Sequence, residues 1–330
     1  MEKVRRCLVM MALYNGEKYL KEQMESLLHQ SYSCFDLYAQ DDGSEDDTWK
    51  IMEKYAAEDP RIHLRRNETG NHGPYQNYNA LFNYCRSLQA YDLYLFCDQD
   101  DVWDQDKLEK LIAFYDRNVC DPGIPVMIQG NFRIIDGDGK VTIPDMDEND
   151  HIRRDGLSMY FDAATWGCNA IFNRALFEDI APVPDRAKRV WGHDQYLARW
   201  ACVRGRMLFD PEVTISYRRY GKNVTSDHAM QVTTKRVLSR IAKLDQLAHD
   251  HAVSYKSALF VLEKLSATKE LTDHEEDTVQ ALERCIQYGG IGAVLFFRQY
   301  HIDLGKKVRT LSHLLILVTG MYRKYLEQIE

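Results

Sequence analysis

Short apolar runs of strand length alternate with helical patterns from residue 6 to residue 217, and this alternation constrains the fold most. Apolar residues in the first helical segment recur at three- and four-residue spacing, at Tyr19, Leu20, Met24 and Leu27. Such alternation is typical of a mostly parallel, doubly wound α/β sheet with helices on both faces. The predicted strands cover residues 6–13, 35–40, 61–64, 92–97, 125–128, 168–172, 207–209 and 213–217, and predicted helices cover 17–30, 45–57, 78–85 and 107–115.

Two acidic motifs directly follow predicted strands. Asp41-Asp42-Gly43-Ser44 comes after residues 35–40, and Asp98-Gln99-Asp100-Asp101 comes after residues 92–97. Ligands of open α/β sheets bind beyond the carboxyl ends of the strands. We therefore expect both motifs at the ligand-binding edge of the sheet.

Composition excludes several classes of protein. The chain is 45% hydrophobic and 28% charged with a net charge of −8, which fits a globular protein and disfavours a nucleic-acid binder. No apolar stretch approaches the roughly 18 residues that span a bilayer. The apolar N-terminal segment lacks a cleavage site for a signal peptide and runs into the turn Asn15-Gly16. The eight cysteines form no C-x-x-C pair, which favours reduced, buried thiols in a cytosolic protein and disfavours zinc.

The character of the sequence changes after about Asp227, which suggests a catalytic domain over residues 1–227 and a helical C-terminal region over 228–330. A long apolar stripe at helical period runs from Val237 to Leu265. Thr272 to Glu275 resembles a capping box, and Gly289-Gly290 is expected to end that helix. The last forty residues combine apolar runs with interleaved Lys and Arg. They either cover their own core or lie as interfacial helices on anionic lipid.

Five aspartates lie between residues 98 and 106, just after a strand too apolar to be exposed. Clustered carboxylates repel one another unless a cation compensates. Carboxylate oxygens suit Mg²⁺ or Mn²⁺, which completes its shell with phosphate and water. Asp98 and Asp100 are thus the candidate metal and nucleotide residues, whereas Asp104 and Asp106 fit the acidic start of the next helix.

Two further motifs suggest binding and catalysis. Tyr14 and Asp41 could form a pocket with an aromatic face and a carboxylate that accepts from a pyrimidine N–H. Asp194, in the segment Trp191 to Leu197, either caps a helix or acts as a general base. Gly167 would allow a ligand to approach the backbone closely.

Together these motifs resemble those of family 2 glycosyltransferases with the GT-A fold, and most of all the bacterial rhamnosyltransferase-type branch. The resemblance covers residues 5–225 and rests on Tyr14-Asn15-Gly16-Glu17-Lys18-Tyr19-Leu20, Asp41-Asp42-Gly43-Ser44, Asp98-Gln99-Asp100-Asp101-Val102-Trp103 and His193-Asp194. It implies that Tyr14 and Asp41 contact the base and Asp98 the ribose, with Asp42 also in the nucleotide-binding set. Asp100 would bind the metal and Asp194 would be the catalytic base. The acceptor or diphosphate side would consist of Gly167, Cys168, Asn169, Trp191, His193, Arg219 and Tyr220.

One position departs from the family pattern. Relatives often carry a histidine in an R-x-H-G-x-N-like segment, and this chain has Tyr220 within Arg218-Arg219-Tyr220-Gly221-Lys222-Asn223. A neutral phenol is a poor Mg²⁺ ligand. We expect Tyr220, Arg219 or Lys222 to hydrogen-bond the diphosphate instead.

The resulting hypothesis is a metal-dependent, inverting glycosyltransferase of bacterial surface polysaccharide synthesis. A single base without a second carboxylate nucleophile favours inversion. The expected donor is dTDP-L-rhamnose, with UDP-glucose or UDP-galactose as alternatives, and the expected acceptor is a glycan or lipid-linked glycan. The expected location is the cytoplasm, and a peripheral position at the inner face of the cell membrane is the alternative. A sugar nucleotidyltransferase would show a basic, Gly-rich loop at Tyr14 to Glu17, and intact Asp100 and Asp194 argue against a non-catalytic carbohydrate-binding protein.

Overall fold

The computed structural model describes residues 4–154, 156–182, 192–221, 244–268 and 270–329. The chain divides into two compact units, each described here by itself. Unit 1 comprises residues 1–149, 166–187 and 208–224, and unit 2 comprises residues 150–165, 188–207 and 225–330. The domain boundary suggested at residue 227 stays a prediction.

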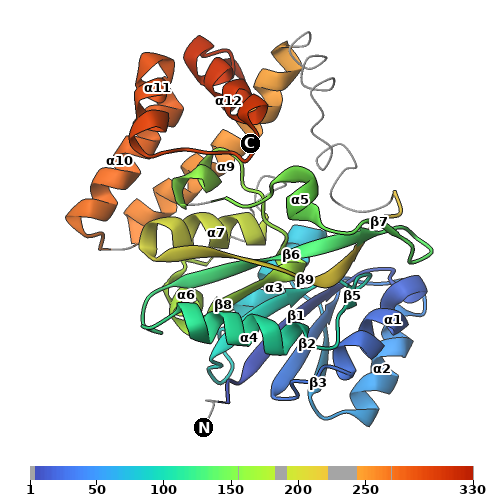
Figure 1. The fold of residues 1–330 in the computed structure, drawn as a ribbon. Coiled ribbons are helices and arrows are strands. Elements are labelled where there is room, and N and C mark those ends of the chain that lie inside the picture. The colour runs from blue at the N-terminus through green and yellow to red at the C-terminus, as the bar shows by residue number, and fades with distance from the viewer. Residues whose placement is uncertain (1–3, 155, 183–191, 222–243, 269, 330) are drawn as a thin grey trace. The chain divides into compact units, whose positions relative to one another are not determined.

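Unit 1 is built on one nine-stranded mixed sheet (Figure 1). Its main path runs in the order β3-β2-β1-β4-β8-β6-β9-β5, and β7 pairs with β6. The first four strands in this order are mutually parallel, as the sequence predicts. Their bounds are β1 (Cys7–Leu13), β2 (Phe35–Asp41), β3 (Ile62–Arg66) and β4 (Leu93–Cys97). The other strands are β5 (Val102–Trp103), β6 (Val126–Ile135), β7 (Val141–Ile143), β8 (Ala170–Asn173) and β9 (Arg206–Arg218).

The helices of unit 1 cover the apolar strands. β4 is buried along its whole length, and β1 is buried except at Ala12, because the sheet is covered on both faces. Helix α1 packs against α2, and α3 packs against β1 and β2. The strand order turns back between β1 and β4, and right-handed crossovers then put α3 on the face opposite α1 and α2. The bounds are α1 (Glu17–Leu28), α2 (Thr48–Glu58), α3 (Pro74–Cys85), α4 (Lys107–Asn118), α5 (Met146–Asp150) and α6 (Arg174–Asp179).

The far half of the sheet differs from the prediction in three ways. β8 is antiparallel to both β4 and β6, so the sheet is mixed. Residues 207–209 and 213–217, predicted as two strands, belong to the single strand β9, in which Pro211 is exposed and needs no ladder hydrogen bond. The strand predicted from Cys168 begins only at Ala170, because residues Gly167–Asn169 form the 3-10 turn η2.

Unit 2 is helical. Its elements are η1 (Gly156–Tyr160), α7 (His193–Arg204), α9 (Leu244–Thr268), α10 (Asp273–Tyr288), α11 (Gly290–Gln299), α12 (Lys307–Thr319) and α13 (Arg323–Leu326). The predicted capping box at Thr272 and Glu275 is present. Gly289 ends α10 at a φ of 52°, and a Cβ there would lie 2.2 Å from the carbonyl oxygen of Leu317. The part of the predicted stripe from Val237 to Ile241 lies outside the described residues.

The sequence led us to expect reduced, buried cysteines and no helix that spans a membrane. All eight cysteines fall in the described part of the chain as free thiols, and five are buried. Cys120 is exposed, however, and Cys34 and Cys202 are half-buried, so the expectation of buried thiols holds only in part. Among the described helices, none is long and apolar enough to cross a bilayer.

Candidate active site

The loops after β1 and β4 meet where the strand order of the sheet reverses, which is where open α/β sheets bind ligands. The side chain of Gln99 joins them, since its Oε1 accepts from the Tyr14 N–H at 2.9 Å and its Nε2 donates to the Tyr14 carbonyl at 2.8 Å. A Cβ on Gly16 would lie 2.4 Å from Gln99 Oε1, so a glycine at this position leaves room for the Gln99 amide. The Tyr14 ring remains 54% exposed and is available for stacking.

Asp41 and Asp42 organise the turn after β2. Asp41 accepts from the Ser44 hydroxyl at 2.5 Å and from the backbone N–H groups of Gly43 and Ser44 at 3.1 Å each. Gly43 has a φ of 88°, which the turn requires. Asp42 accepts from the Gly73 N–H at 2.7 Å and from Asn67 Nδ2 at 2.6 Å. Both carboxylates are buried and hold the loop, and their predicted contact with a nucleotide stays a prediction.

The acidic loop after β4 brings three carboxylates together. Asp98 accepts from the Tyr78 hydroxyl at 2.8 Å, and Asp100 accepts from the Tyr220 hydroxyl at 2.7 Å. Burial, reinforced by the charge of Asp98, raises the pKa of Asp100 to about 6. Burial, and then the charges of Asp100 and Asp98, raises the pKa of Asp101 well above its usual range. Holding these buried carboxylates together in their charged form costs free energy, and a bound cation would reduce that cost.

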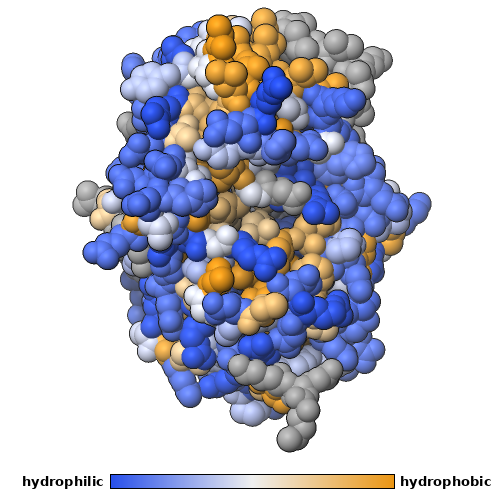
Figure 2. Space-filling view, turned by 60° about the vertical axis from the view of Figure 1, so that its left-hand side comes forward, coloured by the Kyte–Doolittle hydropathy of each residue, from blue (hydrophilic) through white to orange (hydrophobic). Residues whose placement is uncertain are grey.

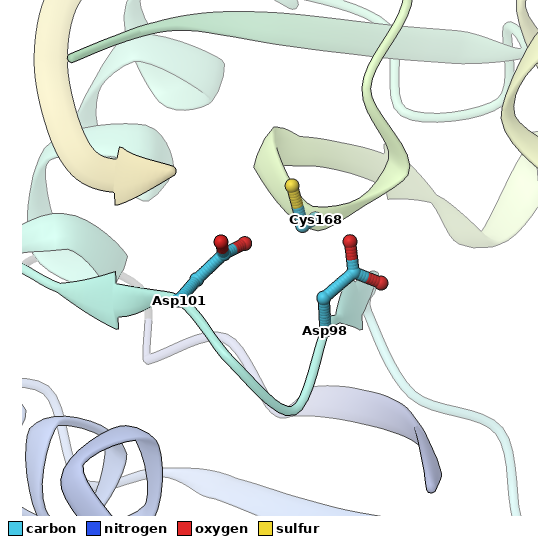
Figure 3. Close-up of side chains that lie close together, drawn as sticks. All are labelled: Asp98, Asp101 and Cys168. Atoms are coloured by element: carbon cyan, nitrogen blue, oxygen red, sulfur yellow. The ribbon is translucent and has the colours of Figure 1, made fainter. Parts of the chain in front are cut away.

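Asp98, Asp101 and Cys168 form a group whose possible ligand atoms all lie within 4.8 Å of one another. Figure 3 shows Asp98 and Asp101 on the acidic loop and Cys168 on η2, with their side chains converging. Burial raises the pKa of the Cys168 thiol well above its usual range, so it stays protonated and is a poor ligand for an oxygen-preferring cation. The carboxylates of Asp98 and Asp101 offer the oxygen ligands that Mg²⁺ and Mn²⁺ prefer, and Asp100, the metal residue expected from the sequence, is not in this group. The sequence predictions did not include Asp101 among the site residues.

Arg218, at the end of β9, ties the acidic loop to the rest of unit 1. Its Nε donates to the Asp100 carbonyl at 2.8 Å, and its backbone N–H donates to Asp101 Oδ1 at 3.0 Å. Its Nη2 donates to Glu22 at 2.5 Å, and its guanidinium lies 4.5 Å from the centre of the Tyr19 ring. The Arg218 side chain is buried, and its positive charge bonds directly to the loop backbone at Asp100. Sequence reasoning named Arg219 and Tyr220 but missed this neighbour.

Lys107 anchors the η2 turn. It is fully buried, and its Nζ donates to Asn169 Oδ1 at 2.6 Å and to the Cys168 carbonyl at 3.2 Å. Burial lowers the pKa of Lys107 to about 8. Asn169 is itself buried and donates to the Asn131 carbonyl at 2.9 Å. The Asn169 amide therefore holds the turn in place, and the predicted acceptor role of Gly167, Cys168 and Asn169 stays a prediction.

The predicted catalytic base belongs to unit 2. Asp194 lies in the first turn of α7, where Gly192 is the N-cap residue, so Asp194 does not occupy the capping position. Burial lowers the pKa of the neighbouring His193 to about 3, which keeps this imidazole neutral. In unit 1, the Arg219 N–H donates to the Ile135 carbonyl at 2.8 Å. Trp191, Lys222 and Asn223 lie outside the described residues.

Comparison with known proteins finds similar sequences and similar folds. The chain is 25% identical over 222 residues to the dTDP-rhamnosyl transferase RfbG of Shigella flexneri, covering 64% of this chain and 72% of RfbG. It is 37% identical over 111 residues to EpsE of Bacillus subtilis, covering 33% of this chain but only 38% of EpsE.

Two solved structures share the fold. The crystal structure of Staphylococcus aureus TarS residues 1–349 with UDP-GlcNAc matches with a TM-score of 0.56 and 18% identity, covering 98% of this chain and 91% of that one. The mannosyltransferase PcManGT from Pyrobaculum calidifontis, in complex with GDP-Man and Mn²⁺, matches with a TM-score of 0.51 and 15% identity, covering 100% and 89%. These matches confirm the expected GT-A-like α/β fold with C-terminal helices. The sequence model named Glycosyl transferase family 2 matches residues 8–181, more than half of the chain. The chain thus belongs to glycosyl transferase family 2.

Proposed function

We propose that this protein is a metal-dependent, inverting glycosyltransferase that uses a nucleotide-sugar donor in bacterial surface polysaccharide synthesis. The observation that carries the proposal is the acidic loop at the point where the strand order reverses. Asp98 and Asp100 lie in this loop, and Gln99 between them bonds to both backbone groups of Tyr14, a residue that is itself exposed. An aromatic face next to carboxylates suits a base and a cation-bound diphosphate.

The donor half of the proposal assigns Tyr14 and Asp41 to the base and Asp98 to the ribose. The first candidate donor is dTDP-L-rhamnose, with UDP-glucose and UDP-galactose as alternatives. The name of the Shigella flexneri relative, a dTDP-rhamnosyl transferase, supports the first choice. The fold neighbours in complex with UDP-GlcNAc and GDP-Man support a nucleotide-sugar donor in general.

Asp100, with Asp98 beside it, would hold Mg²⁺ or Mn²⁺, which would neutralise the charge that develops on the leaving diphosphate. The Mn²⁺ in the mannosyltransferase complex supports a divalent cation. The raised pKa of Asp100 also supports one, because repulsion from Asp98 is among its causes. Arg219 would face the diphosphate as a hydrogen-bond donor, and Tyr220 would lie on the same side with its single hydroxyl proton donated to Asp100.

Asp194 would act as the general base. It takes the proton of the acceptor hydroxyl while that oxygen bonds to the anomeric carbon and the bond to the diphosphate oxygen breaks. One displacement of this kind inverts the anomeric centre. The proposed acceptor is a glycan or lipid-linked glycan, with His193, Gly167, Cys168 and Asn169 on the acceptor side.

A thermal-shift panel of sugar nucleotides with and without Mn²⁺ tests the donor and the metal together. A ligand that binds only the native protein raises the melting temperature. We expect dTDP-L-rhamnose with Mn²⁺ to give the largest shift, and UDP-sugars to give the next largest. No shift with any sugar nucleotide would contradict the proposal. A larger shift with a nucleoside triphosphate than with any sugar nucleotide would favour a nucleotidyltransferase.

Asp100→Asn tests the metal assignment. The amide keeps the size of the side chain but removes its charge, so we expect at least a hundredfold loss of transfer and a weaker dependence of donor binding on Mn²⁺. Asp104→Asn is the matched control, because Asp104 pairs with Arg133 outside the proposed metal ligands. Equal turnover of wild type and Asp100→Asn would remove Asp100 from the metal site.

Asp194→Asn tests the base. Donor binding should persist, because no donor contact is assigned to Asp194, while transfer should fall by roughly 10²–10⁴-fold. Calorimetry with the donor and turnover assays separate these effects. Transfer at the wild-type rate would exclude Asp194 as the base.

A further inference from the structure

Exposed apolar side chains concentrate at the C-terminal end of the chain. Among the described residues, seven of the twelve large hydrophobic side chains that are exposed fall between residues 288 and 318. Six of them lie on α11 and α12, two helices that pack against each other. Figure 2 shows apolar side chains gathered at the top of the view, where Figure 1 draws these helices. We define the α11–α12 surface by Ile291, Val294, Leu295, Leu311, Leu315 and Val318.

Each of the two helices is apolar on two sides. In α11 the buried side carries Phe296 and Phe297, and in α12 it carries Ile316 and Leu317. These side chains contribute to the core of unit 2, and the exposed apolar side chains do not. The exposed side chains recur at the spacing of one helical face, at positions i, i+3 and i+4 in α11 and at i, i+4 and i+7 in α12. Large contiguous apolar patches are rare on the surface of soluble proteins, and they mark interaction sites.

The charge around this surface identifies the kind of partner. Residues 289–326 contain six Lys and Arg against one Asp, a net charge of +5 in a chain whose net charge is −8. Lys306 and Arg309 pair with Asp150 and Lys324 pairs with Asp245, whereas Arg298, Lys307 and Arg323 are exposed. A second copy of the chain would bring like charges together in a two-fold contact. Anionic lipid offers both the acyl chains and the negative charge that this surface matches.

We propose that the α11–α12 surface docks on an anionic phospholipid bilayer, with both helices lying in the interface. The exposed leucine, isoleucine and valine side chains enter the boundary between headgroups and acyl chains, and the exposed Arg298, Lys307 and Arg323 lie at the lipid phosphates. This binding needs no spanning helix, and none occurs among the described residues. The inference is independent of the donor and of the reaction.

Vesicle co-sedimentation of the full chain tests the proposal. We expect binding to vesicles that contain phosphatidylglycerol, weak binding to pure phosphatidylcholine, and weaker binding at high salt. Leu295→Ser and Leu311→Ser should each weaken binding about tenfold through lost apolar transfer. Lys307→Gln should weaken it about fivefold. Val141→Ser is the matched control, because Val141 is an exposed apolar residue of unit 1.

Two results would overturn the inference. One is equal sedimentation of wild type, Leu295→Ser and Lys307→Gln. The other is a dimer in light scattering that Leu311→Ser disperses while vesicles bind neither protein, which would make the surface a contact between copies. Melting temperatures check that each variant is folded. Transfer to a water-soluble acceptor, measured without vesicles, keeps a failure of the proposed function separate from a failure of lipid binding.

Discussion

The Tyr220 hydroxyl occupies one oxygen of Asp100, the residue assigned to the metal. A carboxylate has two oxygens, so this bond fixes the rotation of Asp100 and still allows a ligand on the other side. The Tyr220 ring is in turn held by Tyr19, with ring centres 4.9 Å apart. Groups that orient a metal ligand in this way contribute to metal affinity without touching the ion.

Tyr220→Phe should therefore weaken the binding of Mn²⁺ about tenfold in the presence of dTDP, as measured by titration calorimetry. The phenylalanine ring keeps the packing against Tyr19 and removes only the hydroxyl. Tyr19→Phe is the control, because the Tyr19 hydroxyl accepts from Lys18 rather than donating to an aspartate. If Tyr220→Phe binds Mn²⁺ as tightly as wild type, the bond to Asp100 has no role in holding the metal.

At single residues, the sequence indicates which side chains are chemically unusual but not what surrounds them. The acidic loop could be predicted because clustered carboxylates directly after a buried strand are energetically unfavourable. This pattern can be read from a short stretch of consecutive residues. Gln99 and Lys107 were missed, because their partners are Tyr14 and Asn169, 85 and 62 residues away. Asp42 was taken as a nucleotide residue, and its bonds to Asn67 and to the Gly73 N–H became visible only in the folded loop.

At the scale of elements, strand β9 is hydrogen-bonded at its end to the acidic loop. It ends in Arg218, whose side chain reaches the Asp100 carbonyl and Glu22 on α1, while its backbone meets Asp101. A strand end thus orders a loop through Asp101, which lies 117 residues earlier in the chain. The guanidinium suits this role because it offers several donors in one plane.

Arg218→Met should lower the free energy of unfolding by about 2–3 kcal/mol, because buried hydrogen bonds of a charged donor are lost. Chemical denaturation measures this effect. Glu22→Gln should cost less than about 1 kcal/mol, since the Glu22 side chain is 54% exposed and its pairing is screened by water. Arg218→Lys should recover only part of the stability. An Arg218→Met protein as stable as wild type would show that the loop is held by other contacts.

The parallel half of the sheet was predictable, because β1 and β4 are apolar runs and the strands alternate with helical segments. In the other half the sequence located β6, β8 and β9 only in part, and it gave no sign of β5 and β7. β5 has two residues and β7 has three, which are too few for any periodic pattern. Asp210-Pro211 reads as a break in β9, although a proline is tolerated where the strand needs no donor.

At the scale of the whole molecule, the two units have separate cores, and unit 2 contains a histidine that is sensitive to acid. His313 is buried, shares a hydrogen bond of 3.0 Å with the Tyr255 hydroxyl, and lies beside His251. Burial lowers the pKa of His313 to about 4, although the charge of Asp162 acts in the opposite direction; Arg309 and Arg154 lower it further. The neutral imidazole is therefore the folded form.

Acid should destabilise unit 2 through this group. Between about pH 6.5 and pH 4 the unfolded chain binds a proton at His313 that the folded protein does not, so stability falls as the pH falls. The full effect is about 3 kcal/mol. His313→Asn keeps an acceptor for Tyr255 and should lose this part of the pH dependence in calorimetric melting. His301→Asn is the control, because His301 is exposed. If the stability of wild type and of His313→Asn changed with pH in the same way, the prediction would be contradicted.

The contact between Gly16 and Gln99 links two distant positions of the chain. Any side chain at position 16 would collide with the amide that joins the loops after β1 and β4. Because this amide is the far end of a flexible side chain, alanine at position 16 would displace it and break its two hydrogen bonds to Tyr14. We expect Gly16→Ala and Gln99→Ala to be less harmful together than the sum of their separate effects, so that the two positions evolve as a pair.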